Sequence, residues 1–337
     1  MNNLEIGRFL RLPEAGAAIS LVVVVLFFVI FGHVGISTFL GAASWVNFAA
    51  NLGIVAIPVG ILMMAGEIDI SIGAMIPAGS MSIAIVSGYY GLPIVVGIII
   101  SLGIGVLVGL VNGILTTRTS VPSLIITLGT LVAMQGIVLS ASVMLTHSAG
   151  VPLAAPLWSK TIFGQLLGGS YQVIILWWLA LAAIYHFVMR FTRFGNWIFA
   201  MGGDEDSARN AGIPTRRMTI ALFVLSATSA SFVGMCGAIL FNSAQVSGGM
   251  NYIFNVIVSV VVGGVLLTGG FGSVIGIFFG TLTFAVVNQG IYFTNIDRNW
   301  SSLIIGIMLL VAVLMNNLFR KMALTYSPRK KEVRVAQ

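Results

Sequence analysis

The sequence predicts an all-α, polytopic membrane protein with about ten transmembrane helices and both termini in the cytoplasm. Charged residues make up 7% of the chain and hydrophobic residues 58%, and the mean hydropathy is +1.07. A water-soluble fold of this composition would have almost nothing polar for its surface. The apolar runs are continuous and do not alternate with polar residues, which favours helices over a β-barrel.

The apolar runs give the expected crossings in chain order: 17–35, 46–65, 70–88, 92–116, 121–146, 170–189, 218–240, 251–268, 274–294 and 301–319. The first is expected to be retained, because no small-residue cleavage site follows a short apolar region there. The expected organisation is a cytoplasmic N-terminus at 1–16, a transmembrane domain at 17–319 with a cytoplasmic loop at 190–217, and a basic cytoplasmic tail at 320–337.

The distribution of lysine and arginine supports this count, because cytoplasmic loops carry most basic residues. Of the 16 basic residues, 14 fall on the inner side. These are Arg8, Arg11, Arg118, Arg190, Arg193, Arg209, Arg216, Arg217, Arg320, Lys321, Arg329, Lys330, Lys331 and Arg334. Only Lys160 and Arg298 fall outside. The net charge of +7 therefore indicates membrane topology and not nucleic-acid binding.

Glycine recurs at helical spacing in two places: Gly105, Gly109 and Gly113, and Gly272, Gly276 and Gly280. Small residues four apart let helix backbones approach closely in lipid, so we interpret both sets chiefly as packing surfaces, with pore lining as the alternative.

Two segments, VGILMMAGEIDISIG (59–73) and VGGVLLTGGFGSVIG (262–276), align without gaps at an offset of 203 residues. Each joins an inward-running helix to an outward-running one in the predicted topology. Gly-interrupted apolar segments at matching places in two halves indicate the working centre of a transporter. Chance similarity between Gly-rich strings is the alternative.

Glu67 and Asp69 are the only charged residues between Ala15 and Thr117. A carboxylate at mid-membrane costs roughly 3 kcal/mol, so both are expected at a membrane face, in a wet cavity or against hydrogen-bond donors. Asp69 followed by Ser71 suits a helix start, where a side-chain oxygen accepts from free backbone N–H groups. Helix capping at a cytoplasmic turn is one interpretation, and a gate beside the substrate path is the other.

The longest inner loop contains a short helical pattern, DEDSARNAG, after Gly202 and Gly203. Acidic residues at its start and Gly212 with Pro214 at its end delimit the helix. It is either a solvated connection or a segment that docks into a groove of a cytoplasmic partner.

Four stretches in this order resemble the signatures of one family: GEIDISIG (66–73), VPSLIITLGTL (121–131), GGDEDSARNAGI (202–213) and VVGGVLLTGGFGSVIG (261–276). They look like those of the ribose-type sugar permeases, the membrane subunits of bacterial ATP-binding-cassette (ABC) importers, a group related to branched-chain amino acid permeases. The resemblance covers roughly 45–315. Glu67 departs from it, where a second glycine is usual, and so does Phe271, where a polar or basic residue is common.

The resemblance implies a multi-pass protein of the bacterial inner membrane that works with cytoplasmic ATP-binding subunits, a periplasmic sugar-binding protein and a second permease subunit, identical or related. It also implies that 204–213 is the coupling helix, with Asp204, Glu205, Ala208, Arg209 and Gly212 in the ATPase groove. The sequence has no G-x-x-x-x-G-K-[ST] phosphate loop, so we expect ATP hydrolysis on a partner chain.

Polar residues inside the crossings are candidates for the substrate path: Asn47, Asn51, Asn112, Gln135, Asn255, Asn288 and Gln289. Neutral amides suit a neutral polyhydroxyl cargo, although such groups also bond helix to helix. We expect a pentose or other monosaccharide, with a sugar-like quorum signal or a polyol as alternatives.

Two other classes of protein fit less well. A stand-alone carrier or channel usually places ionisable residues within its bundle, and such residues are nearly absent from the expected crossings. A membrane enzyme needs a clustered nucleophile, base or metal site, but His33, His147 and His186 are far apart in sequence. We therefore expect no catalytic residue, no bound metal and no cofactor.

Overall fold

The computed structural model describes residues 13–31 and 34–294, with isolated positions up to 310 (297, 300, 303–304, 306–307 and 310). The terminal segments 1–12 and 311–337 and most of the predicted crossing at 301–319 lie outside the described residues. So do Arg298 and the basic residues of both ends. The termini and the tail expected at 320–337 therefore stay predictions.

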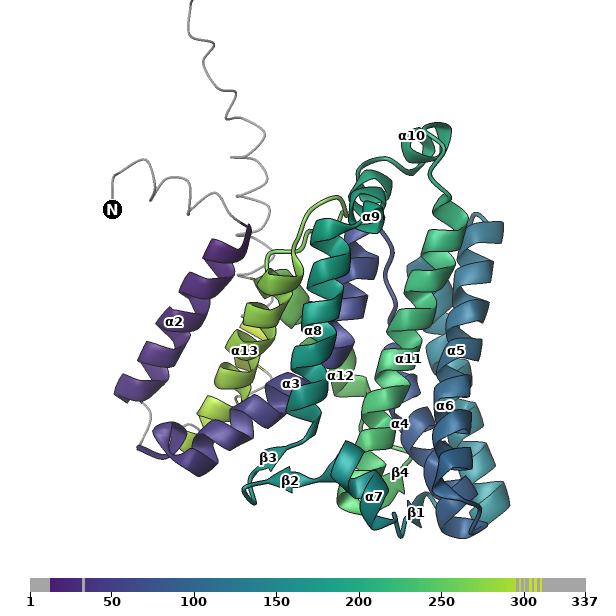
Figure 1. The fold of residues 1–337 in the computed structure, drawn as a ribbon, viewed down its shortest axis with the longest axis vertical. Helices are drawn as coiled ribbons and strands as arrows, with labels where there is room; N and C mark the ends of the chain where they lie inside the picture. Colours follow the sequence, from purple (N-terminus) through teal and green to yellow (C-terminus); the bar gives the residue numbers. More distant parts are fainter. Residues whose placement is uncertain are drawn as a thin grey trace, which may run out of the picture.

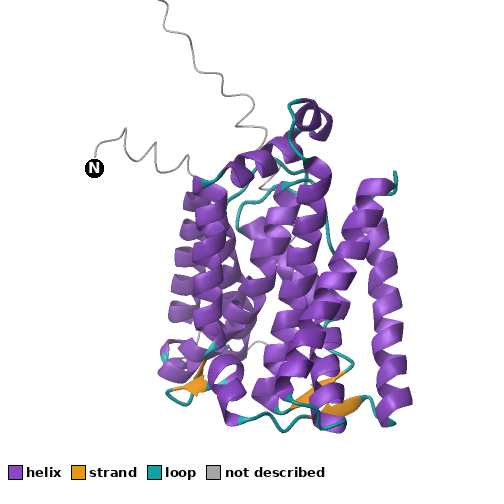
Figure 2. Cartoon of the chain, turned by 45° about the vertical axis from the view of Figure 1, so that its right-hand side comes forward, coloured by secondary structure: helices purple, strands orange, loops and turns teal. Residues whose placement is uncertain are grey.

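The described chain is a bundle of helices with two short β pairs at one end (Figures 1 and 2). The long helices are α2 (Pro13–Phe31), α3 (Phe39–Met64), α4 (Ile72–Ile83), α5 (Ile94–Arg118), α6 (Ser123–Thr146), α8 (Ile174–Phe191), α11 (Thr215–Phe241), α12 (Met250–Val262) and α13 (Val274–Gly290). The short ones are η1 (Val34–Ser37), the π-helical η2 (Ala84–Tyr89) that continues α4, α7 (Leu157–Ser159), η3 (Lys160–Gly164), α9 (Arg193–Gly203), α10 (Glu205–Asn210) and η4 (Ile291–Phe293).

Within the described residues, seven helices are long and apolar enough to cross a membrane. They correspond to the predicted crossings at 46–65, 70–88, 92–116, 121–146, 170–189, 218–240 and 274–294. Two further apolar helical segments are shorter, Gly16–Ile30 within α2 and Met250–Val262 (α12). The helix α12 ends at Val262, six residues before the predicted limit. Glycines in the segment after Val262, including Gly264 and Gly269 with positive φ, turn the chain there. An all-α polytopic architecture is thus confirmed.

The two β pairs lie at the end of the bundle opposite α10 (Figure 1). The strand β1 (Gly150–Pro152) pairs antiparallel with β4 (Ser243–Gln245), and β2 (Leu166–Leu167) pairs with β3 (Tyr171–Gln172). Two further backbone bonds, Leu153 N–H to Asn242 O at 2.8 Å and Val246 N–H to Ala149 O at 3.1 Å, extend the first pair. This pair joins the chain after α6 to the chain after α11.

The first glycine set packs α5 against α11, as the spacing predicts. A Cβ atom added at Gly105, Gly109 or Gly113 would lie 2.5 to 2.7 Å from a Cα atom of α11. In the second set, added Cβ atoms at Gly276 and Gly280 would overlap carbonyl oxygens of Gly263 and Ser259 at the end of α12. Close backbone contact in the apolar bundle therefore depends on these positions having no side chain.

This packing predicts that only one of two alanine substitutions in α5 lowers stability. In Gly109→Ala the new methyl group would lie 2.5 Å from the Cα of Val224, so the free energy of unfolding should fall by about 1–3 kcal/mol. A lower melting temperature in detergent measures this loss. Gly103→Ala is the matched control, because no atom lies within 4 Å of its Cβ position, and the better helix propensity of alanine should leave its stability equal or higher. Equal melting temperatures for the two variants would contradict the packing argument.

Candidate functional site

A cavity of about 530 Å³ lies beside the β pairs, because residues of β3 and β4 line it. Its walls come from α3, α4, η3, the start of α8, α11, the start of α12, the end of α13, and the strands β3 and β4. Five side-chain amides line it: Asn47, Asn51, Gln172, Gln245 and Gln289. Serine hydroxyls and the phenol of Tyr252 add further polar groups. No charged side chain is among the described residues that line it, and its volume is within the range of small-molecule sites.

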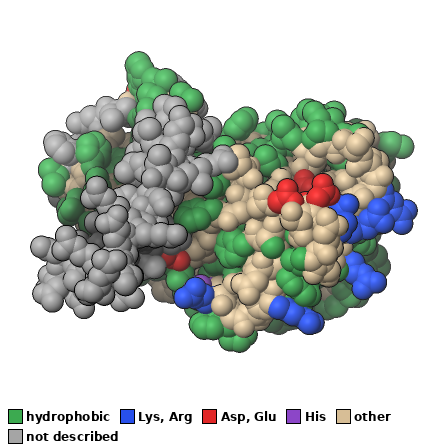
Figure 3. Space-filling view, turned by 90° about the horizontal axis from the view of Figure 1, so that it is seen from above, with side chains coloured by type: hydrophobic (Ala, Val, Ile, Leu, Met, Phe, Trp, Pro, Cys, Tyr) green, Lys and Arg blue, Asp and Glu red, His purple; other side chains and the backbone are tan. Residues whose placement is uncertain are grey.

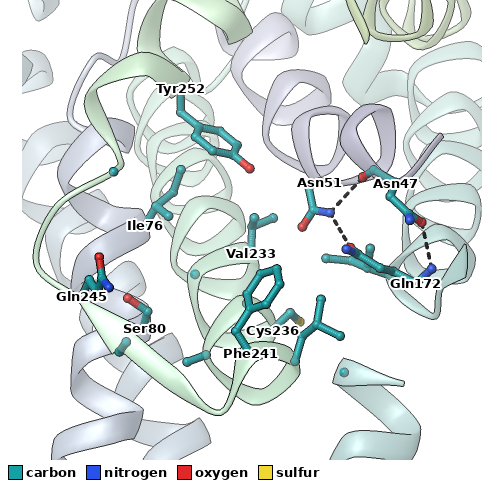
Figure 4. A pocket seen from close by; sticks show the side chains of 18 of the residues that line it. Asn47, Asn51, Ile76, Ser80, Gln172, Val233, Cys236, Phe241, Gln245 and Tyr252 are labelled. Carbon is teal, nitrogen blue, oxygen red and sulfur yellow. Dashed lines mark hydrogen bonds between the residues drawn. The ribbon is translucent and has the colours of Figure 1, made fainter. Parts of the chain in front are cut away.

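The amides of α3 are held in fixed orientations by the chain before α8. Asn47 donates from Nδ2 to the carbonyl of Ser170 at 2.8 Å and accepts from the backbone N–H of Gln172 at 2.8 Å. Asn51 donates from Nδ2 to the carbonyl of Asn47 and to Gln172 Oε1, both at 2.8 Å. Its Oδ1 has no donor among the described residues, and it points away from these partners (Figure 4). The side-chain oxygen Oδ1 of Asn51 can thus accept a hydrogen bond from the hydroxyl group of a bound molecule.

Asp69 lies away from this cavity, in a buried hydrogen-bond network that we call the Asp69 network: Asp69, Ser71, Asn112, Thr130 and Ser226. Asp69 Oδ1 accepts from the N–H and the hydroxyl of Ser71 at 2.9 and 2.6 Å, and Oδ2 accepts from the Ser226 hydroxyl at 2.7 Å. Asn112 donates to the Ser71 hydroxyl at 3.0 Å and accepts from Thr130 at 2.6 Å. Asp69 is 1% exposed, and its carboxylate accepts from three neutral donors. It links the start of α4 to α11 directly through Ser226. It also links α4 to α5 and α6 indirectly, through Ser71, Asn112 and Thr130.

The non-helical segment before α4 is supported by α6. The backbone N–H groups of Ile68 and Ile70 donate to the hydroxyls of Ser123 and Thr127 at 3.2 and 3.3 Å. Backbone groups that leave a helix inside an apolar bundle need such partners. Residues of the segment 121–131 thus hydrogen-bond to the backbone of the segment 66–73. Burial raises the pKa of the Glu67 carboxyl in this segment, and a hydrogen bond from Ser123 opposes the shift.

The two similar sequence segments meet at the opposite end of the bundle from the cavity. Gly66 and Gly269, equivalent at the offset of 203, have φ of 93° and 80°. The N–H of Gly270 donates to the carbonyl of Met64 at 2.8 Å, so the turns are in direct contact. Gly202, near the end of α9, packs on both, and a Cβ added there would overlap the Met64 carbonyl oxygen and the Gly270 nitrogen. We call these four glycines and Met64 the turn junction.

The helix α10 follows the turn junction and projects beyond the bundle (Figure 1). Asp204 caps it by accepting from the Ser207 N–H at 2.6 Å, and the Ser207 hydroxyl and N–H lower the pKa of the Asp204 carboxyl. Arg209 pairs with Glu205 at 2.9 Å on the exposed surface, where solvent weakens an ion pair. Ala208 is buried, and Gly212 with a φ of 85° ends the helix. The short helix predicted from DEDSARNAG is confirmed.

The structure separates the predicted path residues into two sets. Asn47, Asn51 and Gln289 line the cavity. The others do not: Asn112 belongs to the Asp69 network, Gln135 donates to the sulfur of Met250, Asn255 lies half-buried on α12, and Asn288 accepts from Gln289. Polarity inside an apolar run identifies a candidate but does not give its direction.

Sequence reasoning missed Gln172, Gln245 and Tyr252. Gln172 and Gln245 lie in short strands that the apolar pattern does not mark. Tyr252 follows Gly248 and Gly249 at the start of a short apolar segment, and a glycine pair in front of such a segment is typical of an interrupted helix beside a transport site. Among the residues that the structure describes, no group of three or more His, Cys, Asp or Glu residues could hold a metal ion.

Comparison with known proteins decides the family. The family described as the branched-chain amino acid transport system / permease component matches residues 41–313. The chain belongs to this family. The permease is 29% identical to the fructose import permease protein FrcC of Rhizobium meliloti over 93% of this chain and 88% of the relative.

Two further relatives carry names of sugar import permeases. The permease is 30% identical to the xylose/arabinose import permease protein XylH of Sulfolobus acidocaldarius, over 80% of this chain and 75% of the relative. It is 27% identical to the ribose import permease protein RbsC of Escherichia coli K12, over 78% and 81%. No solved structure matches. The expected resemblance is confirmed, as is the expectation of a multi-pass ABC-importer permease subunit and not an enzyme.

Proposed function

We propose that the permease moves a neutral monosaccharide across the bacterial inner membrane through the described cavity. The observation that carries this proposal is the lining of that cavity, which consists of amides, hydroxyls and apolar groups without a charged side chain among the described residues. A neutral polyhydroxyl cargo needs no charged partner. The names of the relatives, which refer to fructose, xylose, arabinose and ribose, agree with such a cargo. A sugar-like signal or a polyol is the alternative cargo.

The proposed path passes Asn47, Asn51 and Gln289, where the Asn51 carbonyl accepts from a cargo hydroxyl. The Asp69 network lies outside the cavity lining, and we assign it a structural role at the start of α4. Glu67 lies at the neighbouring turn, beside the inner end of the path. A permeation route must release what it admits, so we expect weak binding of the cargo at these groups.

The proposed topology has ten crossings with both termini cytoplasmic, and the α10 end faces the cytoplasm. Six of the seven described lysine and arginine residues, all except Lys160, lie at that end. Figure 3 looks down on this end and shows Lys and Arg side chains beside a cluster of Asp and Glu side chains. An excess of basic residues on one side is typical of the cytoplasmic side. The proposed domain limits remain 17–319 for the membrane domain, with the loop 190–217 and a basic tail at 320–337.

The proposed partners are cytoplasmic ATP-binding subunits, a periplasmic sugar-binding protein and a second permease subunit. We assign α10 to the ATPase groove, with Asp204, Glu205 and Arg209 as exposed contacts. Ala208 and Gly212 shape the helix, since one packs it on the bundle and the other ends it. This assignment agrees with the projection of α10 beyond the bundle (Figure 1).

Uptake into vesicles that contain the full importer tests this function. Labelled D-fructose, D-xylose and D-ribose are offered in turn, each with the cognate binding protein outside and ATP inside. We expect uptake of at least one sugar, and loss of that uptake when the ATPase subunit is disabled by substitution of its phosphate-loop lysine. Uptake that continues with the disabled ATPase would contradict the proposal and favour a stand-alone carrier.

In the same assay, Asn51→Ala should lower the maximal uptake rate at least about tenfold. The substitution removes the acceptor that faces the cavity and also releases Gln172, and a lost hydrogen bond at this kind of site costs about 1–3 kcal/mol. Asn255→Ala is the matched control, because Asn255 is a half-buried amide of α12 outside the cavity lining. Equal loss in both variants would remove Asn51 from the path.

A further inference from the structure

Tyr252 occupies an unusual place, because the helix that carries it begins inside the bundle. Gly249, directly before α12, packs on α4 so closely that an added Cβ would overlap the carbonyl oxygen of Gly73. The first turn of α12 therefore forms part of the cavity wall, and Tyr252 is its aromatic member. Figure 4 shows the ring extending from α12 toward the side of the cavity that carries Asn51.

The two facing walls offer different chemistry. On the α3 side, the Asn51 carbonyl is an oriented acceptor that has no donor among the described residues. On the α12 side, the half-buried Tyr252 has no hydrogen-bond partner among the described residues, and its hydroxyl, which is not one of the buried unpartnered atoms, opens on the cavity. The Tyr252 hydroxyl, which can donate and accept, thus lies across the cavity from the Asn51 Oδ1, which can only accept. The tyrosine ring adds an apolar face.

A cyclic monosaccharide matches this pair of walls. Its ring carries C–H groups on one face and hydroxyls around its edge, so one molecule can lie against an aromatic face and still hydrogen-bond at its rim. A linear polyol has the same hydroxyls but no persistent flat C–H face, and it loses more conformational freedom when it is fixed in one shape. The cavity should therefore distinguish the two on shape, although both are neutral.

We propose that Tyr252 is a specificity-determining residue that, opposite Asn51, selects a cyclic monosaccharide over a linear polyol. This inference rests on the proposed function and specifies the cargo class. Tyr252 acts through contact of its ring face with the C–H face of the sugar, and its hydroxyl takes one bond at the sugar rim.

Protection of a reporter cysteine tests the inference on the permease itself. The reporter is Ser247→Cys, a nearly isosteric change at an exposed residue of the cavity wall, in a Cys236→Ala background that removes the native cysteine. A polar methanethiosulfonate reagent labels it in detergent-solubilised importer. We expect high concentrations of at least one of D-fructose, D-xylose and D-ribose to slow labelling at least about twofold, while sorbitol at the same concentration does not.

The Tyr252 variants then assign the effect. Tyr252→Leu should abolish the difference between sugar and sorbitol, while Tyr252→Phe should retain most of it. Phe254→Leu, which changes an exposed aromatic residue of the same helix, should behave as the parent does. Protection that is unchanged in Tyr252→Leu, or equal for sorbitol and sugars, or absent for all of them in the parent, would overturn the inference. The uptake assay is separate, so failure of the labelling experiment leaves the proposed function to be decided on its own.

Discussion

Gly202→Ala should reduce transport at least about tenfold while the ATPase subunit still co-purifies with the permease. The new methyl group would overlap the Met64 carbonyl and the Gly270 nitrogen, so α9 and α10 would be displaced from the end of α3 and from the turn that precedes α13. The helix α3 carries Asn47 and Asn51 of the cavity, and the turn junction joins α9 to the Met64 end of this helix. With α10 as the ATPase contact that we propose, ATP-driven motion would then no longer reach the cavity. The measurement is uptake and ATPase activity in the same vesicles.

Gly203→Ala is the control for this prediction, because no atom lies within 4 Å of its Cβ position. It should transport within about twofold of the parent, as expected for a substitution without strain. In a second control, Asp204, Glu205 and Arg209 are all replaced by alanine. Since we assign these residues to the ATPase contact, the ATPase subunit should no longer co-purify with this variant. If Gly202→Ala transports as well as Gly203→Ala, the turn junction does not transmit the motion.

Asp69→Ala should be the most destabilising single alanine substitution in the Asp69 network. It removes three accepted hydrogen bonds and leaves the Ser71 and Ser226 hydroxyls without their partner inside the bundle. Hydrogen bonds to a charged group contribute about 1.5–3 kcal/mol each, and each buried donor left without its partner costs about 1–3 kcal/mol. The thermal unfolding temperature in detergent and the yield of folded protein measure the effect.

Two companions separate the network from general polarity. Ser226→Ala removes one of the three bonds and should cost about 1–3 kcal/mol. Glu67→Ala, at a position only partly buried, should cost less than either. A double variant of Asp69 and Ser226 should be less destabilised than the sum of the single effects, because the two residues share a bond. Asp69→Ala that is as stable as Glu67→Ala would exclude a structural role for the network.

The positions of the long helices could be predicted from sequence because each needs a continuous apolar run to cross lipid. The interrupted elements could not. The helix α12 stops at Val262 although apolar residues continue, since Gly263 packs directly on α13 and the chain turns there. The helix α9 was missed, although its segment is amphipathic, because the whole of 190–217 was assigned to a loop between two crossings.

For the site, sequence alone identified Asn47, Asn51 and Gln289 but also included Asn112, which bonds to Ser71 in the buried network. In a soluble protein the polar face of a helix is the wet one, whereas in lipid both faces of a helix are apolar. A single amide then has no pattern around it that reveals which way it points. The pairing of Asp69 with Ser226, 157 residues away, likewise depends on tertiary packing.

The walls of the cavity differ in how they tolerate sequence change. Main-chain bonds between β1 and β4 fix the position of Gln245 and Ser243, whatever side chains stand there. The opposite wall depends on the amides of Asn47, Asn51 and Gln172 themselves, so a change at one disturbs the others. During evolution, a shift in cargo preference can therefore begin by exchange of the β4 side chains without moving the backbone, while the α3 side diverges only through coordinated replacements.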